Sequence, residues 1–159
     1  MDDKKIQGFV INESPSLLLL HYICDFRSDG LMVLRRCDIS SIETLEVDRF
    51  QTELLKEEGV FESIDFGSSY KVDSWEEFFL SANGQNELFI VEQELIDEPD
   101  LAIGKILRIG KNQIDLHYFT GIGRWLDELD RIDYANITSC QLDTNYINVY
   151  KRYFERIDA

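Results

Sequence analysis

Two stretches of this chain align without a gap: GFVINESPSLLLLHY at residues 8–22 and GKILRIGKNQIDLHY at residues 104–118. The identical pairs are Gly8/Gly104, Leu20/Leu116, His21/His117 and Tyr22/Tyr118. The chain has two histidines, and they fall opposite each other. Self-similarity at a fixed offset is typical of a duplicated structural unit. We therefore expect two copies of one unit, within residues 1–59 and 102–159, separated by an insert at residues 60–101.

Each copy has the pattern of several short strands. Apolar stretches at residues 8–12 and 104–108 end in turn residues, and apolar and mixed positions alternate from Ile114 to Phe119. A Ser-Asp-Gly turn precedes the apolar run 31–34, and residues 39–45 with their counterpart 137–142 indicate a further strand. Four or five strands in about 50 residues predict a small, strongly bent barrel in each copy.

Each copy ends in a segment that can form a helix. Residues 50–58 have helical spacing, and Gly59 stands where a helix C-terminal cap is expected. Residues 146–157 also carry apolar side chains along one helical face. The first part of that segment, residues 145–149, fits a closing strand equally well, so both alternatives stay open for it.

The insert combines a helix signal with a strand signal. The stretch Ser74-Trp-Glu-Glu77 is a capping box, apolar residues follow it, and Asn83-Gly84 marks the end of the helix. The apolar run 88–91 then indicates a strand, ahead of an acidic segment at residues 92–100. We expect this helix and strand to cover one barrel or to bridge the two.

Some short motifs resemble those of a known group of proteins. The string DGLMVLRRCDI at residues 29–39, and GRW at 123–125 followed by IDYANIT at 132–138, are similar to motifs in small uncharacterised bacterial proteins with tandem Sm-like or SH3-like barrel repeats. The resemblance implies a mainly β fold with a few short helices (β/α+β), built from two tandem Sm-like/SH3-like barrels that a helix-and-strand insert joins. It implies no reaction, because the motifs are structural.

Charge is distributed unevenly along the 159 residues. The chain has 16 Lys and Arg against 31 Asp and Glu, a net charge of −15, and residues 61–101 hold a single lysine, Lys71. A chain this acidic repels a nucleic-acid backbone at long range. The acidic surface serves solubility or docks on a basic partner protein.

The composition favours a cytoplasmic globular protein. Apolar residues make up 44% of the chain, and the longest uninterrupted apolar run, at 17–20, is far shorter than a membrane span requires. The N-terminal MDDKK lacks the features of a secretory signal. Three widely spaced cysteines (Cys24, Cys37 and Cys140) are expected to be reduced, buried thiols.

The sequence predicts no catalytic, cofactor-binding or metal-binding residue. His21 and His117 lack companions at metal-ligand spacing, and their matching positions favour a structural role such as a ring nitrogen bonded to nearby backbone. Gly121-Ile-Gly123 lacks the third glycine of a dinucleotide-binding loop and fits a tight hairpin turn better. We therefore expect a protein that is not an enzyme.

Four residues are candidates for contact with a partner. Trp125 beside Arg124 is either an exposed hot spot or a side chain packed against the insert helix. Lys151 and Arg152 lie among aromatic residues, an arrangement that either binds single-stranded nucleic acid or packs its aromatic side inward. The leading prediction is a protein-interaction module, monomeric or dimeric, and one version of it is an acidic, immunity-type antagonist of a basic partner. The alternative is RNA or single-stranded nucleic-acid binding through the second copy.

Overall fold

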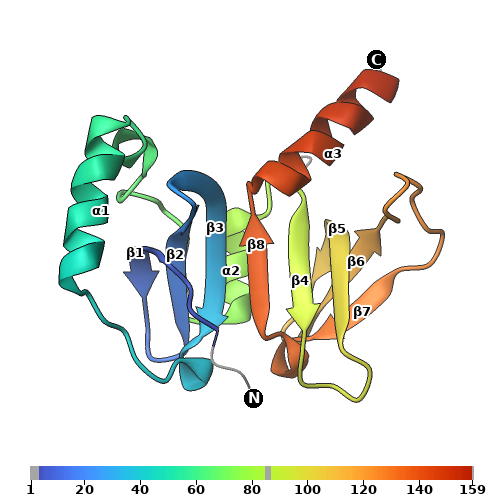
Figure 1. Ribbon diagram of the computed structural model, residues 1–159. Coiled ribbons are helices and arrows are strands. Elements are labelled where there is room, and N and C mark those ends of the chain that lie inside the picture. Colours follow the sequence, from blue (N-terminus) through green and yellow to red (C-terminus); the bar gives the residue numbers. More distant parts are fainter. Residues whose placement is uncertain (1–3, 85–86, 159) are drawn as a thin grey trace.

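A computed structural model describes residues 4–84 and 87–158, which form one mixed α+β structure (Figure 1). The strands are β1 (Gly8–Glu13), β2 (Leu17–Cys24), β3 (Arg27–Arg35), β4 (Phe89–Gln93), β5 (Asp100–Ile109), β6 (Gln113–Tyr118), β7 (Asp130–Asp133) and β8 (Ser139–Leu142). The helices are α1 (Glu46–Glu57), α2 (Trp75–Ala82) and α3 (Asn145–Ile157). Single turns of 3-10 helix are η1 (Arg36–Asp38), η2 (Phe61–Ser63) and η3 (Tyr134–Asn136).

All eight strands belong to one open antiparallel sheet, in the order β1-β2-β3-β8-β4-β5-β6-β7. The expectation of two tandem barrels is therefore wrong: within the described ranges, no pairing closes either half of the sheet. The physical reason lies at the free edge of β3. That edge pairs with β8 from the far end of the chain, as in Val33 opposite Cys140, and β4 of the insert joins β8 to β5.

The two aligned stretches form hairpins with the same register. Gly8 lies opposite Tyr22 in one hairpin, and Gly104 lies opposite Tyr118 in the other. Both hairpins also shift register at the same place, between Val10 and Asn12 in the first and between Ile106 and Arg108 in the second. A bulge of this kind bends a strand and increases its twist, so both halves of the sheet curve in the same way.

The shared glycines are explained by a close approach of backbone. A Cβ on Gly8 would lie 2.5 Å from the carbonyl oxygen of His21, and a Cβ on Gly104 would lie 2.0 Å from that of His117. Real Cβ atoms do not come so close to another atom. Each hairpin therefore requires a residue without a side chain at this position.

The segment at residues 39–45 is not a strand, contrary to expectation. It is an irregular connection between η1 and α1, whereas its counterpart contains β8. Strand β8 pairs with β3 on one edge and with β4 on the other, whereas no strand among the described residues pairs with residues 39–45. The open alternative for residues 145–149 is decided in favour of the helix.

The predicted helix ends are present. Ser74 caps α2, where its side-chain oxygen accepts a hydrogen bond from the backbone N–H of Glu77 at 3.1 Å. Gly59 follows α1 with a φ of 77°, a left-handed conformation that suits glycine. Local hydrogen-bonding chemistry is thus enough to define these two ends.

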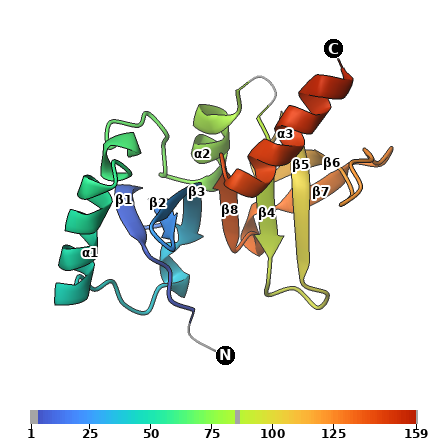
Figure 2. The ribbon, with the colours of Figure 1, turned by 45° about the horizontal axis from the view of Figure 1, so that its top comes forward.

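Helix α2 packs on one side of the sheet, and α3 packs on the other (Figure 2). Phe78 and Phe79 of α2 are fully buried in a cluster that takes residues from both halves of the sheet, including Leu19, Val33 and Leu116. The insert helix therefore bridges the two halves, one of the two roles expected for it. Along β4, Phe89 and Val91 face α2, whereas Leu88 and Ile90 belong to the cluster under α3.

The cysteines differ from the expectation in exposure. Cys140 is fully buried, and burial raises the pKa of its thiol. Cys24 and Cys37 are exposed, because the first ends β2 at a tight turn and the second lies in η1. Among the described helices, none has the length and apolar character that crossing a bilayer demands.

The close approach at Gly104 gives a direct test of the fold. We expect Gly104→Ala to lower the free energy of unfolding by about 2 kcal/mol or more, because the new methyl group forces the β5–β6 hairpin apart. Chemical denaturation followed by circular dichroism measures this loss. Gly121→Ala is the matched control, since a Cβ there meets nothing within 4 Å. Equal stability of the two variants would contradict the explanation.

Candidate functional site

The predicted partner-binding residues lie on two segments that pack against each other: the loop after β6, residues 119–126, and helix α3. The loop is a tight turn in which Phe119 forms an isolated bridge with Trp125. The backbone N–H of Gly123 donates to the Thr120 carbonyl at 2.8 Å, and Gly123 has a φ of 73°. The Gly-x-Gly stretch thus forms a tight turn, as the sequence indicated.

Trp125 is half-buried within a cluster of aromatic rings. Its ring centroid lies 5.0 Å from that of Phe119, 4.9 Å from that of Phe154 in α3 and 4.8 Å from that of His117. The ammonium group of Lys105 lies 5.4 Å from the centre of the indole. Trp125 therefore packs against α3, and not against the insert helix as one of the two expectations had it.

The start of α3 is held firmly against the first half of the sheet. The backbone N–H of Asn145 donates to Asp29 Oδ1 at 2.8 Å, and its side-chain amide donates to the Ser28 carbonyl at 3.1 Å. The Thr144 hydroxyl caps the helix by accepting from the N–H of Ile147. Since Ser28 and Asp29 belong to β3, the helix is oriented by a strand of the other half.

Further contacts fix the middle of α3 to the loop. The Tyr150 hydroxyl donates to the Gly121 carbonyl at 2.8 Å. A Cβ on Gly123 would lie 2.8 Å from the Tyr153 ring, so the loop backbone lies directly beside that ring. Helix and loop therefore form one continuous surface.

One side of α3 is apolar and yet exposed. Ile147 and Phe154 are buried against the sheet, but the exposed fractions of Tyr146, Val149 and Ile157 are 54%, 56% and 56%. Together with Tyr153, 36% exposed, these residues follow helical spacing and form a continuous row, which we call the α3 stripe. The sequence indicated an apolar face over residues 146–157 that packs inward; only part of that face does so.

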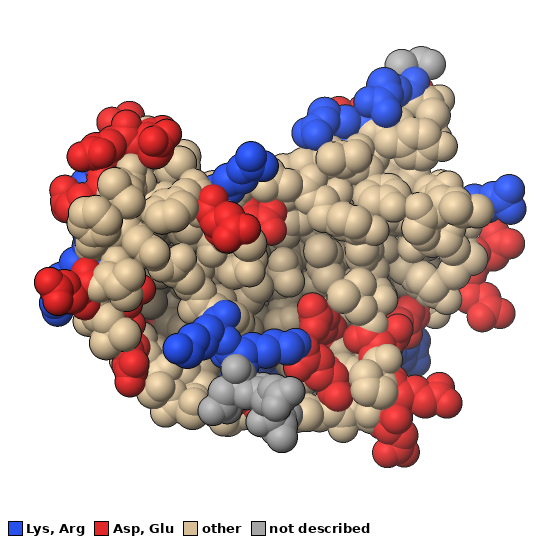
Figure 3. Space-filling view, viewed as in Figure 1, with Lys and Arg blue, Asp and Glu red and all other residues tan. Residues whose placement is uncertain are grey.

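The basic candidates lie beside this stripe. Figure 3 shows Lys and Arg side chains over the outer part of α3, and other basic and acidic side chains spread over the rest of this face. Arg152 and Arg124 are exposed, whereas Lys151 is half-buried. Lys151 lies near Glu87, whose pKa burial raises and the Lys151 charge partly lowers. Arg124, Trp125 and Arg152 therefore lie around one surface, with Trp125 packed beneath it, whereas Lys151 lies on the side of α3 away from the stripe.

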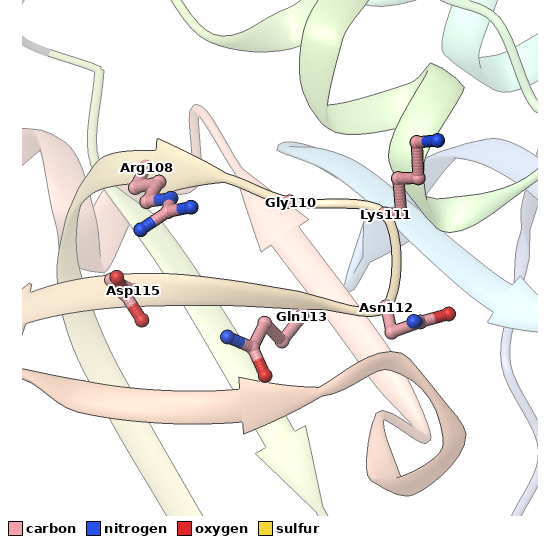
Figure 4. Close-up of a pocket in the computed structure, with 6 residues that line it drawn as sticks. All are labelled: Arg108, Gly110, Lys111, Asn112, Gln113 and Asp115. Atoms are coloured by element: carbon pink, nitrogen blue, oxygen red, sulfur yellow. The ribbon is translucent and has the colours of Figure 1, made fainter.

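A shallow hollow of about 230 Å³ lies at the β5–β6 turn, lined by Arg108, Gly110, Lys111, Asn112, Gln113 and Asp115 (Figure 4). The side chains of Arg108, Gln113 and Asp115 extend from the same side of the two strands, whereas Lys111 points away from them. Asp115 already accepts from Arg131 Nε at 3.2 Å. The lining is thus polar and in part paired internally.

Each histidine bonds the segment that follows its strand: His117 bonds the loop after β6, and His21 bonds the start of β3. His117 Nε2 is 2.9 Å from the carbonyl oxygen of Leu126, and His21 Nε2 forms a hydrogen bond with the Ser28 hydroxyl. Burial lowers the pKa of His21, and the Asp143 carboxylate raises it only in part. No three His, Cys, Asp or Glu side chains come together as a metal site would require, within the residues that the structure describes.

A scan against protein-family models, a search of curated proteins and a search of solved structures found no match for this chain. The resemblance to proteins with tandem Sm-like or SH3-like repeats therefore stays a prediction.

The buried His21 gives a prediction about pH. An unfolded histidine binds a proton with a pKa of about 6.5, whereas the folded state keeps His21 neutral to lower pH. Its contribution to stability is therefore complete above that value and is lost as the pH falls below it. We expect His21→Gln to reduce the fall in unfolding free energy between pH 7 and pH 5, as measured by urea denaturation.

His117→Gln is the matched control for this experiment, because it removes the equivalent imidazole of the other hairpin. The explanation fails if the pH dependence of His21→Gln equals that of the unmodified protein.

Proposed function

We propose that this chain is a protein-interaction module that binds an amphipathic helix of a partner along the α3 stripe. The observation that carries the proposal is the row of exposed apolar side chains on α3, a helix held by its cap, by β3 and by the loop 119–126. A surface fixed before binding loses little conformational freedom when a partner docks. Apolar helix faces are bound in this way by helices with matching anchors.

The charges beside the stripe indicate the chemistry of the partner. Arg152 and Arg156 follow one another at a spacing of four residues, so both lie along one flank of the row. A helix with apolar anchors and acidic residues on the facing flank complements this surface. Arg124, exposed in the same loop, follows Gly123, whose backbone lies beside the Tyr153 ring.

A peptide titration tests this proposal. The probe is a fluorescent helical peptide with apolar residues at three- and four-residue spacing and glutamates on one flank. We expect binding by anisotropy, and we expect Val149→Glu to weaken it by about tenfold or more, because a carboxylate would enter the centre of the apolar contact. Lys111→Glu, an equally exposed change at the β5–β6 turn, is the control. Equal affinity for the wild type and Val149→Glu would exclude the stripe as the binding surface.

A second candidate function is binding of single-stranded nucleic acid at the same helix. It is supported by Tyr146 and Tyr153 of the α3 stripe, which Arg152 and Arg156 flank, since bases stack on aromatic rings while arginines neutralise phosphates. A parallel titration with a single-stranded oligonucleotide distinguishes this candidate function from peptide binding. Binding of single-stranded RNA at low salt that Arg152→Glu abolishes would favour this candidate over the peptide.

The other form of the interaction-module proposal, an acidic antagonist that binds a basic protein, rests on a different surface. Acidic side chains gather around the β4–β5 connection, at the lower right of Figure 3. This acidic cluster consists of Glu92, Glu94, Asp97, Glu98, Asp100 and Asp130. Burial raises the pKa of Asp130, and the nearby charge of Asp100 raises it further. Burial also raises the pKa of Glu92, and the hydrogen bond between Glu92 and Glu94 raises it further. Lys4 already pairs with Glu94 at 3.0 Å, and a cationic partner would relieve the crowding of the other like charges.

A salt titration tests the antagonist version with a lysine-rich peptide as the probe. We expect the affinity to fall steeply as salt is added, because screening weakens the attraction between exposed charges. Asp97→Arg with Glu98→Arg should weaken binding by about tenfold. Glu43→Arg with Glu62→Arg makes the same change in net charge elsewhere and serves as the control. If both double variants lose the same affinity for the peptide, binding depends only on net charge, and the acidic cluster is not a defined binding surface.

A further inference from the structure

Helix α1 carries an exposed apolar row like that of α3. Val47 and Phe50 are 52% and 63% exposed, and half-buried Leu54 continues the row with the same spacing. The two helices correspond at an offset of 99 residues, at which Glu46 and Asn145 both begin their helix. At this offset, Val47, Phe50 and Leu54 match Tyr146, Val149 and Tyr153 of the stripe.

The anchoring of the two helices agrees with this correspondence. The buried apolar residue of α1 is Leu55, and at the same offset it matches Phe154, which is buried in α3. Each helix therefore buries the side chain at this position and leaves the apolar row at the three matching positions uncovered. We call the row on α1 the α1 stripe.

The charges beside the two stripes have opposite signs at the same positions. Glu53 of α1 matches Arg152 of α3, Glu57 matches Arg156, and Lys56 matches Glu155. Glu53 also forms an ion pair with Lys56 at 3.2 Å on its own helix, but such exposed pairs contribute little. The row on α1 is shorter, because Ile157 of the α3 stripe matches Glu58. Over the three shared positions, two helices with apolar rows and opposite flanking charges are complementary to each other.

We infer that the partner of the α3 stripe is the α1 stripe of a second copy of this chain, packed antiparallel. This inference rests on the proposed function. Antiparallel packing brings the same flank of both helices together, so that Glu53 and Glu57 face Arg152 and Arg156 along the contact. The apolar rows then bury each other, as in the seam of a coiled coil.

The positions of α1 and α3 in the fold require that the α1 stripe of one copy contacts the α3 stripe of another copy. In Figure 1, α1 and α3 lie at opposite ends of the molecule, so the helices of one chain do not reach each other. Contacts of α1 with α1, or of α3 with α3, would bring like charges together along the flank, which opposes association. The favoured contact is therefore between unlike helices, either reciprocal in a pair or repeated along an assembly.

Sedimentation velocity of the full chain tests this inference. We expect reversible, concentration-dependent association in the range of about 10–500 μM, because three side chains per helix make a small interface. Variant A, Glu53→Arg with Glu57→Arg, has two basic helices, and variant B, Arg152→Glu with Arg156→Glu, has two acidic ones. Each alone should associate about tenfold more weakly or worse. An equimolar mixture of A and B should associate again, since each basic helix then meets an acidic one.

Asp97→Arg with Glu98→Arg is the control, because it changes the net charge as variant A does while leaving both helices intact. A protein that stays monomeric throughout, or an association that neither variant weakens, would overturn the inference. If the wild type binds the acidic helical peptide and yet stays monomeric, the proposed function stands and only the identity of the partner fails. If it binds no peptide and stays monomeric, both fail.

Discussion

The backbone pairing of β8 with β3 is the interaction on which the rest of this structure depends. Leu31 to Leu34 lie opposite Leu142 to Ser139, and the other edge of β8 pairs with β4. This single short strand joins the three strands β1–β3 to the four strands β4–β7 in one sheet. It also carries α3 directly behind it, so the pairing sets the position of the helix that bears the candidate surface. The contacts of Asn145 with Ser28 and Asp29 reinforce the same junction.

The side-chain packing follows from that junction. With one continuous sheet, a single helix, α2, can bury its aromatic side over strands of both halves, and Phe78 and Phe79 are completely shielded there. The opposite side of the sheet has no such shared cover. Helix α3 packs there through Ile147 and Phe154. Its apolar face extends further around the helix than the strands cover, so the remaining apolar side chains face outward. The candidate surface is thus a consequence of how the halves are joined.

Features set by local chemistry could be predicted from the sequence. Ser74 and Gly59 define helix ends through hydrogen bonds to their own neighbours, and the strands of both hairpins follow from alternation and turn residues. The partners of the strands could not be predicted in this way, because the alternation in residues 139–142 is the same whether they close a barrel or pair with β3. The apolar face of α3 follows from its own helical spacing and could be recognised, whereas the part of that face left uncovered depends on how the helix packs over Ile90 and Phe119.

The junction also has a consequence for the order of events during synthesis. Asn145 contacts Asp29 across 116 positions of sequence, so most of the chain must exist before the first three strands obtain their last neighbour. Proteins dominated by such distant contacts fold slowly, because long loops must close first. During synthesis, the edge of β3 that pairs with β8 stays unpaired until β8 has been made, and an unpaired strand edge can pair with other chains in that interval.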